Sequence, residues 1–353
     1  MTTARSQTVP ADRPGAYHIT SRCVRRAFLC GDAYEHRRGW VEDLIRRWSP
    51  SFAVDVLGYA VMSNHYHLVL KNDPSRAKNW SARQVAERWS KLYPFKDADG
   101  TEHPWPKEEL ERRAGDAAWV EIRRERLAGI SWLMKRINET ISRRANREDG
   151  CTGSFWEGGF KATALLDQAA IIAAMAYVDL NPIRAHMARM PEESAYTSIA
   201  ERIRCRQAFR KKMGLNEHAI TPAASRSLAT AAGIDPGQAG EEDGIWFAPL
   251  RDCRLHDGAY TPSLDEYLDL VDATGRIVRA GKRGSIPAHL LPILERLQID
   301  VDTWVDAMCS MGRMIGTAIG STVARGAEAI LRGLKWIADK ARIHRPPQVA
   351  ENP

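Results

Sequence analysis

Tyr59-Ala-Val-Met-Ser-Asn-His-Tyr-His-Leu-Val-Leu70 is the stretch of sequence that decides the predicted fold. Two runs of β-forming residues flank Ser63-Asn64, a pair typical of a tight turn, so the stretch predicts a β-hairpin. Alternate residues of a strand point to one face, which places His65 and His67 side by side with their Cβ atoms roughly 6.5–7 Å apart. That spacing suits two ligands of one metal ion, although hydrogen-bonded structural histidines would show the same pattern.

The sequence on either side of this hairpin alternates between strand and helix patterns. A period of two predicts strands, and apolar residues every three or four positions predict helices. We expect, in chain order, a strand at 17–23, a helix at 32–48, strands at 53–62 and 66–70, a helix at 75–92, an irregular inserted loop at 94–116, a helix at 117–147, a strand at 160–166 and a helix at 167–180. The predicted fold class is therefore α+β.

The chain has 353 residues, enough for two domains. After about residue 210 its composition shifts toward Ala, Ser and Thr, and amphipathic helical patterns with few β signals return from residue 263. We expect a flexible N-terminus (1–14), a first domain (15–210) with the insertion near 94–116, a linker (211–245), a mainly α-helical C-terminal domain (246–344) and a frayed tail (345–353).

Composition limits the classes of partner and compartment. Apolar residues at 44% and charged residues at 27% exclude wholesale disorder. The 51 basic residues exceed the 44 acidic ones, and the resulting charge of +7 favours nucleic acid as a partner, although a mildly basic cytosolic protein would look the same. The six cysteines form no CxxC pair, the N-terminus lacks an apolar signal region, and no stretch of about 20 apolar residues occurs. We therefore expect a cytoplasmic protein with reduced thiols and no membrane segment.

Positive charge concentrates in the helix predicted around 123–147, which has eight basic and two acidic residues. Its apolar stripe from Ile130 to Ile141 leaves the basic residues on the other side. A solvated helix face is one interpretation of such a run. The other is a DNA-binding face made of Arg123, Arg124, Arg136, Arg143, Arg144 and Arg147.

Tyr177 and Asn181 stand four residues apart at the end of the helix predicted for 167–180, before Pro182. Residues at this spacing share a helix face. The hydroxyl of Tyr177 could attack a phosphodiester as a covalent nucleophile, and the amide oxygen of Asn181 could complete a metal site. The following proline disfavours a helical Asn181, so its side chain could reach elsewhere. Tyr177 could also be an ordinary core residue that packs on the sheet.

Four motifs, in this order, resemble those of the REP-associated tyrosine transposases, relatives of the single-tyrosine insertion-sequence transposases in the HUH nuclease superfamily. The resemblance spans roughly residues 15–200. It implies a ferredoxin-like core in which an antiparallel sheet carries two histidines on a central strand and a nearby helix carries the nucleophilic tyrosine. The motifs are Tyr17-His-Ile-Thr-Ser-Arg22, the stretch Tyr59 to Leu70, Phe155-Trp-Glu-Gly-Gly-Phe-Lys161 and Tyr177-Val-Asp-Leu-Asn-Pro-Ile-Arg-Ala185.

By this resemblance, His65 and His67 match the HUH pair, Tyr177 matches the nucleophile, and Asn181 stands where relatives place a further polar metal ligand. The metal would be Mg²⁺ or Mn²⁺. Further residues in the matched motifs are candidates for DNA contacts, Lys161 and Arg184, or for a supporting role, His18 and Glu157. The sequence departs from the family pattern at Gly159, where arginine is frequent, and at His186, where glycine commonly follows; either change could weaken a DNA contact.

The implied function is cleavage and rejoining of single-stranded DNA that carries hairpin repeats, in the bacterial cytoplasm and at the nucleoid. Tyr177 would form a 5′-phosphotyrosine and release a 3′-OH, and a second 3′-OH could reverse the step without ATP. A base, the metal or Lys161 must help to activate the phenol. A non-catalytic protein that binds repeat hairpins is the main alternative, and an RNA-binding module with a structural metal is another. A monomer and a homodimer are both open.

Overall fold

The protein is described here by a computed structural model, which covers residues 8–10, 12–212, 242, 244–280, 304, 308 and 318–338. The chain divides into two compact units. The first unit comprises Met1–Val56, Val61–Tyr66 and Leu70–Ala162, and the second comprises Leu57–Ala60, His67–Val69 and Thr163–Pro353. Most of the predicted linker (211–245) and all of the predicted tail (345–353) lie outside the described residues, so the predicted domain boundaries stay predictions.

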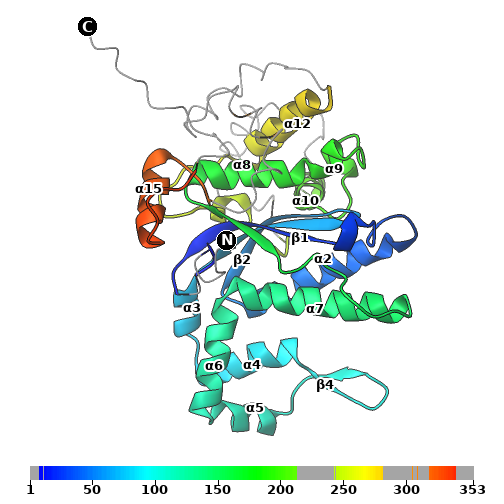
Figure 1. Cartoon of the computed structure of the whole chain (residues 1–353), viewed down its shortest axis with the longest axis vertical. Coiled ribbons are helices and arrows are strands. Elements are labelled where there is room, and N and C mark those ends of the chain that lie inside the picture. Colours follow the sequence, from blue (N-terminus) through cyan, green and yellow to red (C-terminus); the bar gives the residue numbers. More distant parts are fainter. Residues whose placement is uncertain are drawn as a thin grey trace. The chain divides into compact units, whose positions relative to one another are not determined.

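Five strands form one sheet in the order β2-β3-β1-β6-β7. Figure 1 labels β1 and β2 of this sheet. They are β1 (Gly15–Arg22), β2 (Val54–Val61), β3 (His65–Asn72), β6 (Lys161–Leu165) and β7 (Ala318–Ile319). The predicted hairpin is confirmed, because β2 and β3 are neighbours and Met62 N donates to His65 O at 2.8 Å across the turn. Together with the helices, this sheet confirms the α+β class.

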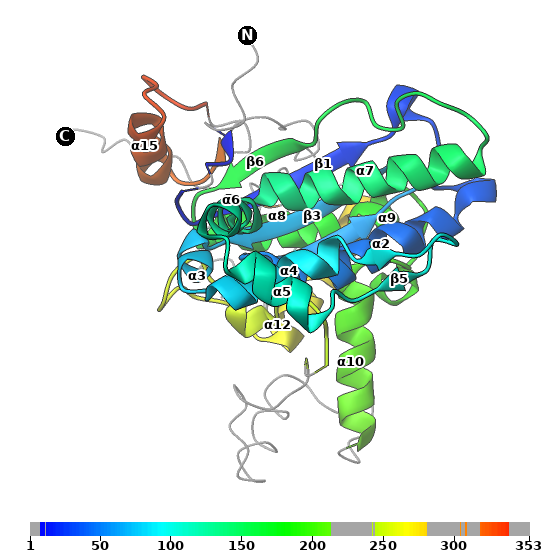
Figure 2. The ribbon, with the colours of Figure 1, turned by 90° about the horizontal axis from the view of Figure 1, so that it is seen from below.

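The first unit contains six α-helices among its described residues, and α6 contacts α3, α4 and α7. Helix α2 packs on α7, and α4 packs on both α5 and α6 (Figure 2). The apolar stripe predicted from Ile130 to Ile141 is buried along α7. The elements are α2 (His36–Trp48), α3 (Pro74–Lys78), α4 (Ala82–Leu92), α5 (Lys107–Ala114), α6 (Ala117–Ala128), α7 (Ile130–Glu148), the short strands β4 (Phe95–Lys96) and β5 (Glu102–His103), and the 3₁₀ turns Val24–Arg26, Asp32–Tyr34 and Ser49–Ser51.

The second unit is built around α8, which continues into the short helix α9. Helix α9 contacts both α8 and α12. A Cβ atom at Gly275 of α12 would lie 3.1 Å from Leu180 Cδ2, so the glycine permits this close approach. The elements are α8 (Gln168–Asp179), α9 (Asn181–Arg184), α10 (Ser198–Lys212), α12 (Leu264–Ala280), α15 (Thr322–Leu331) and the 3₁₀ turns Pro191–Glu193 and Leu250–Asp252.

Side-chain caps fix where the helices begin. Ser81 accepts from Gln84 N, and the Gln84 side chain returns the bond to Ser81 N, which makes a capping box for α4. This box explains why the helix predicted over 75–92 is two helices. Asp116 caps α6 by accepting from Trp119 N, and the predicted cap Asp167 starts α8 by accepting from Ala170 N at 2.9 Å.

Two predictions about regular structure were wrong in detail. The insertion at 94–116 is not an irregular loop, because β4 and β5 pair antiparallel and 107–114 form α5. Its prolines and glycine fall between these elements rather than within them. The helix predicted over 117–147 is broken at Gly129, whose extended backbone (φ −116°, ψ 139°) separates α6 from α7.

The region predicted to be mainly helical also supplies a strand to the sheet. Strand β7 pairs in parallel with β6, with Ala164 opposite Ala318 and Leu165 opposite Ile319. The sheet is therefore mixed rather than purely antiparallel as expected. Two residues are too few for periodicity to reveal a strand, since the pairing with β6 defines it.

His186 occupies a position that favours glycine for a backbone reason. Its φ of 55° lies in the left-handed region, directly after α9. A side chain costs about 1–2 kcal/mol there and glycine costs little. The presence of His186 instead of glycine therefore affects how α9 ends. The predicted effect of His186 on a DNA contact stays a prediction.

Candidate active site

Strand β3 presents alternate residues to two different surroundings. Tyr66 is buried, and its hydroxyl donates to Asn138 Oδ1 of α7 at 2.7 Å. Asn138 Nδ2 in turn donates to Ser21 Oγ of β1 at 3.0 Å. Burial raises the pKa of Tyr66, which keeps this phenol protonated as a donor. His65 and His67 project from the other face of the strand.

Asn64 fixes which ring nitrogen of His65 carries hydrogen. Asn64 Nδ2 donates to the carbonyl of Arg26 at 2.9 Å, and a carbonyl can only accept, so the amide oxygen must face His65. That oxygen lies 2.6 Å from His65 Nδ1 and can also only accept, so Nδ1 carries the hydrogen. The neutral ring therefore carries its lone pair on Nε2, the tautomer in which Nε2 would be the metal-binding atom.

Two histidines of the first unit, the buried His18 and the half-buried His65, are neutral at physiological pH. Burial lowers the pKa of His18 on β1 to about 4. Burial, followed by the nearby charges of Arg22 and His18, lowers the pKa of His65 to about 4 as well. A neutral imidazole is the form that can act as a metal ligand.

We expect the metal-free protein to lose stability as the pH falls from about 6.5 to about 4. The unfolded chain binds a proton at His18 with a pKa of about 6.5, whereas burial lowers the folded pKa to about 4. Between these values the unfolded state holds more protons, so the free energy of unfolding falls by up to about 3 kcal/mol through His18. In urea titrations, His18→Gln should show a smaller change between pH 7 and pH 4 than the wild type or His256→Gln. If His18→Gln lost as much stability between pH 7 and pH 4 as the wild type does, the loss could not be attributed to His18.

The structure brings His67 and Tyr177 together within the second unit. Helix α8 is rich in Ala and Ile, and its residues from Ala169 to Asp179 are all buried. Tyr177 is 4% exposed, and its ring meets the ring of His67 edge-on, with centroids 5.8 Å apart and planes at 84°. Residues predicted to act together, but distant in sequence, are thus neighbours in the fold.

Asn181 is the first residue of α9 and lies beside Tyr177. It is 8% exposed, and its Nδ2 donates to the carbonyl of Tyr177 at 2.9 Å. This bond orients the amide and leaves Oδ1 as its possible ligand atom. Helix α8 ends at Asp179, next to the predicted end at residue 180, and Pro182 stands in the first turn of the separate helix α9, where its missing N–H is not needed.

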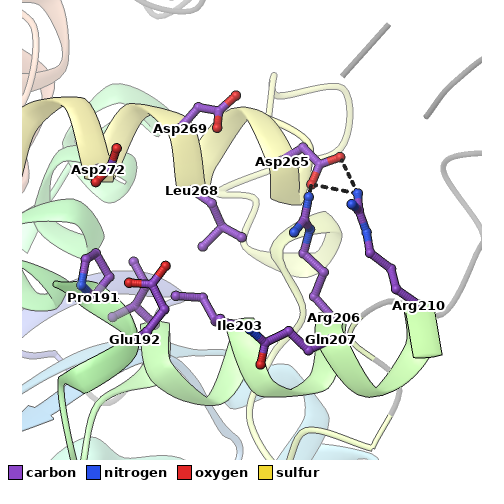
Figure 3. Close-up of a pocket in the computed structure, with 11 residues that line it drawn as sticks. Pro191, Glu192, Ile203, Arg206, Gln207, Arg210, Asp265, Leu268, Asp269 and Asp272 are labelled. Atoms are coloured by element: carbon purple, nitrogen blue, oxygen red, sulfur yellow. Dashed lines mark hydrogen bonds and ion pairs between the residues drawn. The ribbon is translucent and has the colours of Figure 1, made fainter. Parts of the chain in front are cut away.

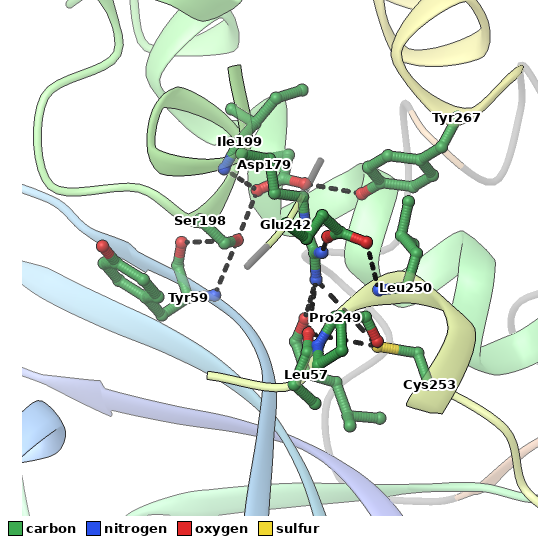
Figure 4. Close-up of polar contacts among 12 residues, drawn as sticks. Leu57, Tyr59, Asp179, Ser198, Ile199, Glu242, Pro249, Leu250, Cys253 and Tyr267 are labelled. Atoms are coloured by element: carbon green, nitrogen blue, oxygen red, sulfur yellow. Dashed lines mark hydrogen bonds and ion pairs between the residues drawn. The ribbon is translucent and has the colours of Figure 1, made fainter. Parts of the chain in front are cut away.

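Asp179 forms a buried network that the sequence analysis did not include (Figure 4). Its carboxylate accepts from Ser198 Oγ at 2.7 Å, from Ile199 N at 3.1 Å and from the hydroxyl of Tyr267 at 2.5 Å. Burial raises the pKa of Asp179, and these hydrogen bonds oppose that effect. The network ties the last turn of α8 to α10 and α12. A single carboxylate in an otherwise apolar helix was the sequence signal for it.

Two arginines of the second unit are held by its C-terminal part. The guanidinium carbon of Arg184 lies 4.9 Å from the ring centroid of Tyr177, and the same group donates to the carbonyl of Met308. The side chain of Arg202 is completely buried; it pairs with Glu242 and donates to the carbonyls of Leu57 and Ala248, each at 3.0 Å (Figure 4). Arg202 is therefore a structural cation.

Several arginines predicted to bind DNA make contacts within the first unit. Arg124 donates to the carbonyls of Ala77 and Trp80 at 2.7 and 2.6 Å, and Arg136 donates to the carbonyl of Leu92 at 2.7 Å. Both arginines tie α6 or α7 to neighbouring elements. Arg123 and Arg144 instead lie over the rings of Trp119 and Trp40, at 4.7 and 3.7 Å from the centroids.

The remaining candidates are exposed. Arg143 pairs with Glu139 on the surface of α7, and Arg147 is exposed near the end of the same helix. Lys161 begins β6, and Glu157 lies in the turn before it, where its backbone N–H donates to the carbonyl of Arg22 at 2.8 Å. The predicted DNA roles of all these residues stay predictions.

A pocket of about 310 Å³ lies beside α10 and α12 in the second unit (Figure 3). Arg206 and Arg210 reach across it to Asp265, the latter at 3.2 Å. The other charged lining residues are the acidic Glu192, Asp269 and Asp272. This excess of carboxylates does not suit a phosphate group.

Within the described residues, no three His, Cys, Asp or Glu side chains cluster as metal ligands. The ligands expected from the sequence, His65, His67 and Asn181, offer imidazole nitrogen and amide oxygen, donor types that Mn²⁺ accepts more readily than Mg²⁺ does. His65 belongs to the first unit, and His67 and Asn181 belong to the second, so the metal site stays a prediction.

Comparisons with known proteins add little to this geometry. No family model and no curated protein match the sequence. A solved structure of a REP-associated tyrosine transposase bound to a REP hairpin is similar with a TM-score of 0.30 and 11% identity, over 57% of this chain and 86% of that chain. A likeness at this level carries no argument about fold or function. Among the described residues, none of the helices has the length and apolar character needed to cross a bilayer.

Proposed function

We propose that this protein cleaves and rejoins single-stranded DNA with hairpin repeats through a covalent 5′-phosphotyrosine intermediate. The observation that carries the proposal is the edge-on contact between His67 and Tyr177, 5.8 Å between ring centroids. It places a phenol beside a strand whose two histidines share one face. A metal site next to a phenol is the combination that phosphodiester cleavage by a tyrosine requires.

The order of the elements supports a ferredoxin-like core as part of this proposal. When the elements from α3 to α6, which lie between β3 and α7, are set aside, the chain runs β1, α2, β2, β3, α7, β6, and the first four strands of the sheet are neighbours in the order β2-β3-β1-β6. A β-α-β-β-α-β sequence is the pattern of that fold. In this order β3 is an inner strand, as the two histidines of such a site require.

His65, His67 and Asn181 would hold the Mg²⁺ or Mn²⁺ ion. When bound, the ion polarises a nonbridging oxygen of the scissile phosphate. Tyr177 Oη attacks phosphorus in line, the bond to the 3′ oxygen breaks, and that oxygen leaves as the 3′-OH with a proton. The new phosphate ester keeps the energy of the broken link, so a second 3′-OH can displace Tyr177 and join strands.

Arg184 supports this step electrostatically. Its guanidinium lies over the Tyr177 ring at 4.9 Å and is anchored by the carbonyl of Met308. A fixed cation beside the phenol stabilises the negative charge that develops on the reacting phosphate. The cellular setting we propose is the bacterial cytoplasm, at the nucleoid.

One observation favours the alternative of a hairpin-binding protein that does not cleave. Tyr177 is 4% exposed and His67 is 2% exposed. A DNA strand must gain access to the phenol of Tyr177 before the phenol can attack it. A protein that only binds DNA needs no such access. The two functions differ in whether a covalent adduct forms.

The test is incubation with labelled single-stranded hairpin DNA and Mn²⁺, followed by a denaturing gel. We expect a slower protein–DNA band that EDTA prevents. His65→Ala and His67→Ala should lose this band yet bind DNA in EDTA within about twofold of wild type, because affinity comes from many phosphate contacts. His103→Ala, an exposed histidine of the first unit, is the control. Stable binding without any adduct would favour the non-catalytic alternative.

A further inference from the structure

The loop at 24–28, here called the Arg–Phe loop, exposes an unusual set of side chains next to the candidate site. Phe28 is 59% exposed, and Arg25 and Arg26 are exposed beside it. Among the described residues, neither arginine forms an ion pair or a side-chain hydrogen bond, and the Phe28 ring has no aromatic partner. A single exposed ring is common on protein surfaces, so what distinguishes Phe28 is its position directly beside two exposed arginines.

The charged residues of the loop's own chain segment have one sign. From Arg22 to Gly31 they are Arg22, Arg25 and Arg26, with no acidic residue among them. The acidic neighbours Glu157 and Asp149 reach this segment from other parts of the chain: Glu157 N donates to the carbonyl of Arg22, and Asp149 pairs with Arg37, which donates to the carbonyl of Leu29. The cations of the loop itself suit an anionic partner.

The backbone of the loop is held in a costly conformation. Arg25 and Arg26 have φ values of 55° and 57°, both in the left-handed region. L-residues other than glycine rarely adopt this backbone conformation, and two in succession are strained. Such strain persists where the surroundings fix it, and it clusters at functional sites.

Hydrogen bonds fix the loop to the turn that precedes His65. Cys23 N donates to the carbonyl of Asn64 and Cys30 N donates to the carbonyl of Ser63, each at 2.8 Å. Asn64 joins the two parts, since its Nδ2 donates to the Arg26 carbonyl at 2.9 Å while its Oδ1 accepts from His65 Nδ1 at 2.6 Å. Two hydrogen bonds in series thus connect the strained arginine backbone to the histidine ring.

Further bonds on the other side hold the loop rigidly. Val24 N donates to the carbonyl of Phe155 at 2.9 Å, and Cys23 forms a β-bridge with Trp156. Phe155 and Trp156 are both buried. A loop fixed in this way loses little entropy when it binds a ligand.

We propose that the Arg–Phe loop binds the unpaired DNA nucleotides that flank the reacting phosphate. Phe28 stacks on a base, and Arg25 and Arg26 contact the phosphates on either side of it. Cations interleaved with an exposed aromatic ring are the general means of binding single strands without reading sequence. The position beside the reacting phosphate rests on the proposed function; the binding of single-stranded DNA by the loop does not.

The first test measures stacking in EDTA, where no cleavage occurs. Removal of one stacked base contact should weaken binding of labelled single-stranded DNA by about 5- to 150-fold in Phe28→Ala. Phe28→Trp should retain affinity. Phe95→Ala is the matched control, because Phe95 is 44% exposed in the same unit. Equal affinities for Phe28→Ala and Phe95→Ala would overturn the proposal.

The second test measures phosphate contacts through salt dependence. Arg25→Gln/Arg26→Gln should reduce the slope of log K against log salt by roughly 1.4, since each contact on single strands contributes about 0.7. Lys78→Gln/Lys91→Gln removes two exposed cations of the same unit and should leave the slope unchanged. Arg25→Gly/Arg26→Gly should behave as the Gln pair does, because glycine adopts the left-handed backbone without strain. An unchanged slope in both arginine variants contradicts the proposal.

The results separate this proposal from the proposed cleavage activity. If binding depends on Phe28 but no covalent adduct forms, the DNA-binding role of the Arg–Phe loop is supported and the proposed cleavage activity is contradicted. If Phe28→Ala forms the adduct with wild-type yield and affinity, the role of the loop is contradicted and the cleavage activity is supported. A wild type that does not bind single-stranded DNA overturns the proposal for the loop.

Discussion

Tyr177→Phe should form no covalent DNA adduct under conditions in which the wild type does. The substitution removes the attacking oxygen and keeps the ring that lies edge-on to His67. Removal of a covalent nucleophile lowers turnover by several orders of magnitude. The denaturing gel with Mn²⁺ measures the adduct, and DNA binding in EDTA should stay within about twofold of wild type.

Tyr66→Phe is the matched control for this experiment. Tyr66 is also buried, but its hydroxyl bonds to Asn138 on the opposite face of β3. We expect Tyr66→Phe to keep the adduct band. An adduct that persists in Tyr177→Phe would place the nucleophile elsewhere, with Tyr66 and Tyr17 the next to replace.

Arg202→Met should destabilise the protein by about 3–5 kcal/mol. The substitution leaves the carboxylate of Glu242, 7% exposed, without its cation, and it leaves the carbonyls of Leu57 and Ala248 without a donor. Urea unfolding can be followed by circular dichroism, because the eleven tryptophans of the chain would all contribute to a fluorescence signal.

Two further variants separate the ion pair from simple loss of volume. Arg204→Met removes a cation whose side chain is 66% exposed on the same helix, and it should change stability by less than about 0.5 kcal/mol. Arg202→Met/Glu242→Gln should be more stable than Arg202→Met alone, because no buried charge is left unpaired. A double variant as unstable as the single one would show that the backbone contacts of Arg202, rather than its pairing with Glu242, hold this region.

Local signals predicted the parts of the fold that local interactions determine. The Ser63-Asn64 turn with its flanking strands, the apolar stripe of α7 and the cap at Asp167 all depend on residues close in sequence, and the structure confirms them. The insertion at 94–116 was misjudged because strands of two residues leave no periodicity, and β4 exists through its pairing with β5.

The sequence indicates candidate site residues, whose roles stay predictions, but it does not indicate how they are arranged in space. The pattern His65-x-His67 and the later Tyr177 are visible in sequence, yet their proximity depends on how the sheet and α8 pack. The position of the hydrogen on His65 Nδ1 depends on Asn64, which is oriented by its bond to the carbonyl of Arg26. The buried carboxylate of Asp179 depends on the hydrogen bond from Tyr267. Such contacts join residues that no short sequence window contains.

The pairing of β7 with β6 has a consequence for shortened forms of the chain. In addition to the strand pairing, Leu166 N donates to the carbonyl of Ile319 at 2.8 Å, and Ser321 N donates at 2.7 Å to Asp167, the residue that caps α8. A chain that ends before residue 318 would leave β6 as an open edge strand, able to pair with other molecules. Proteolysis or premature termination before residue 318 would therefore favour self-association through β6, next to the start of α8, the helix that carries Tyr177.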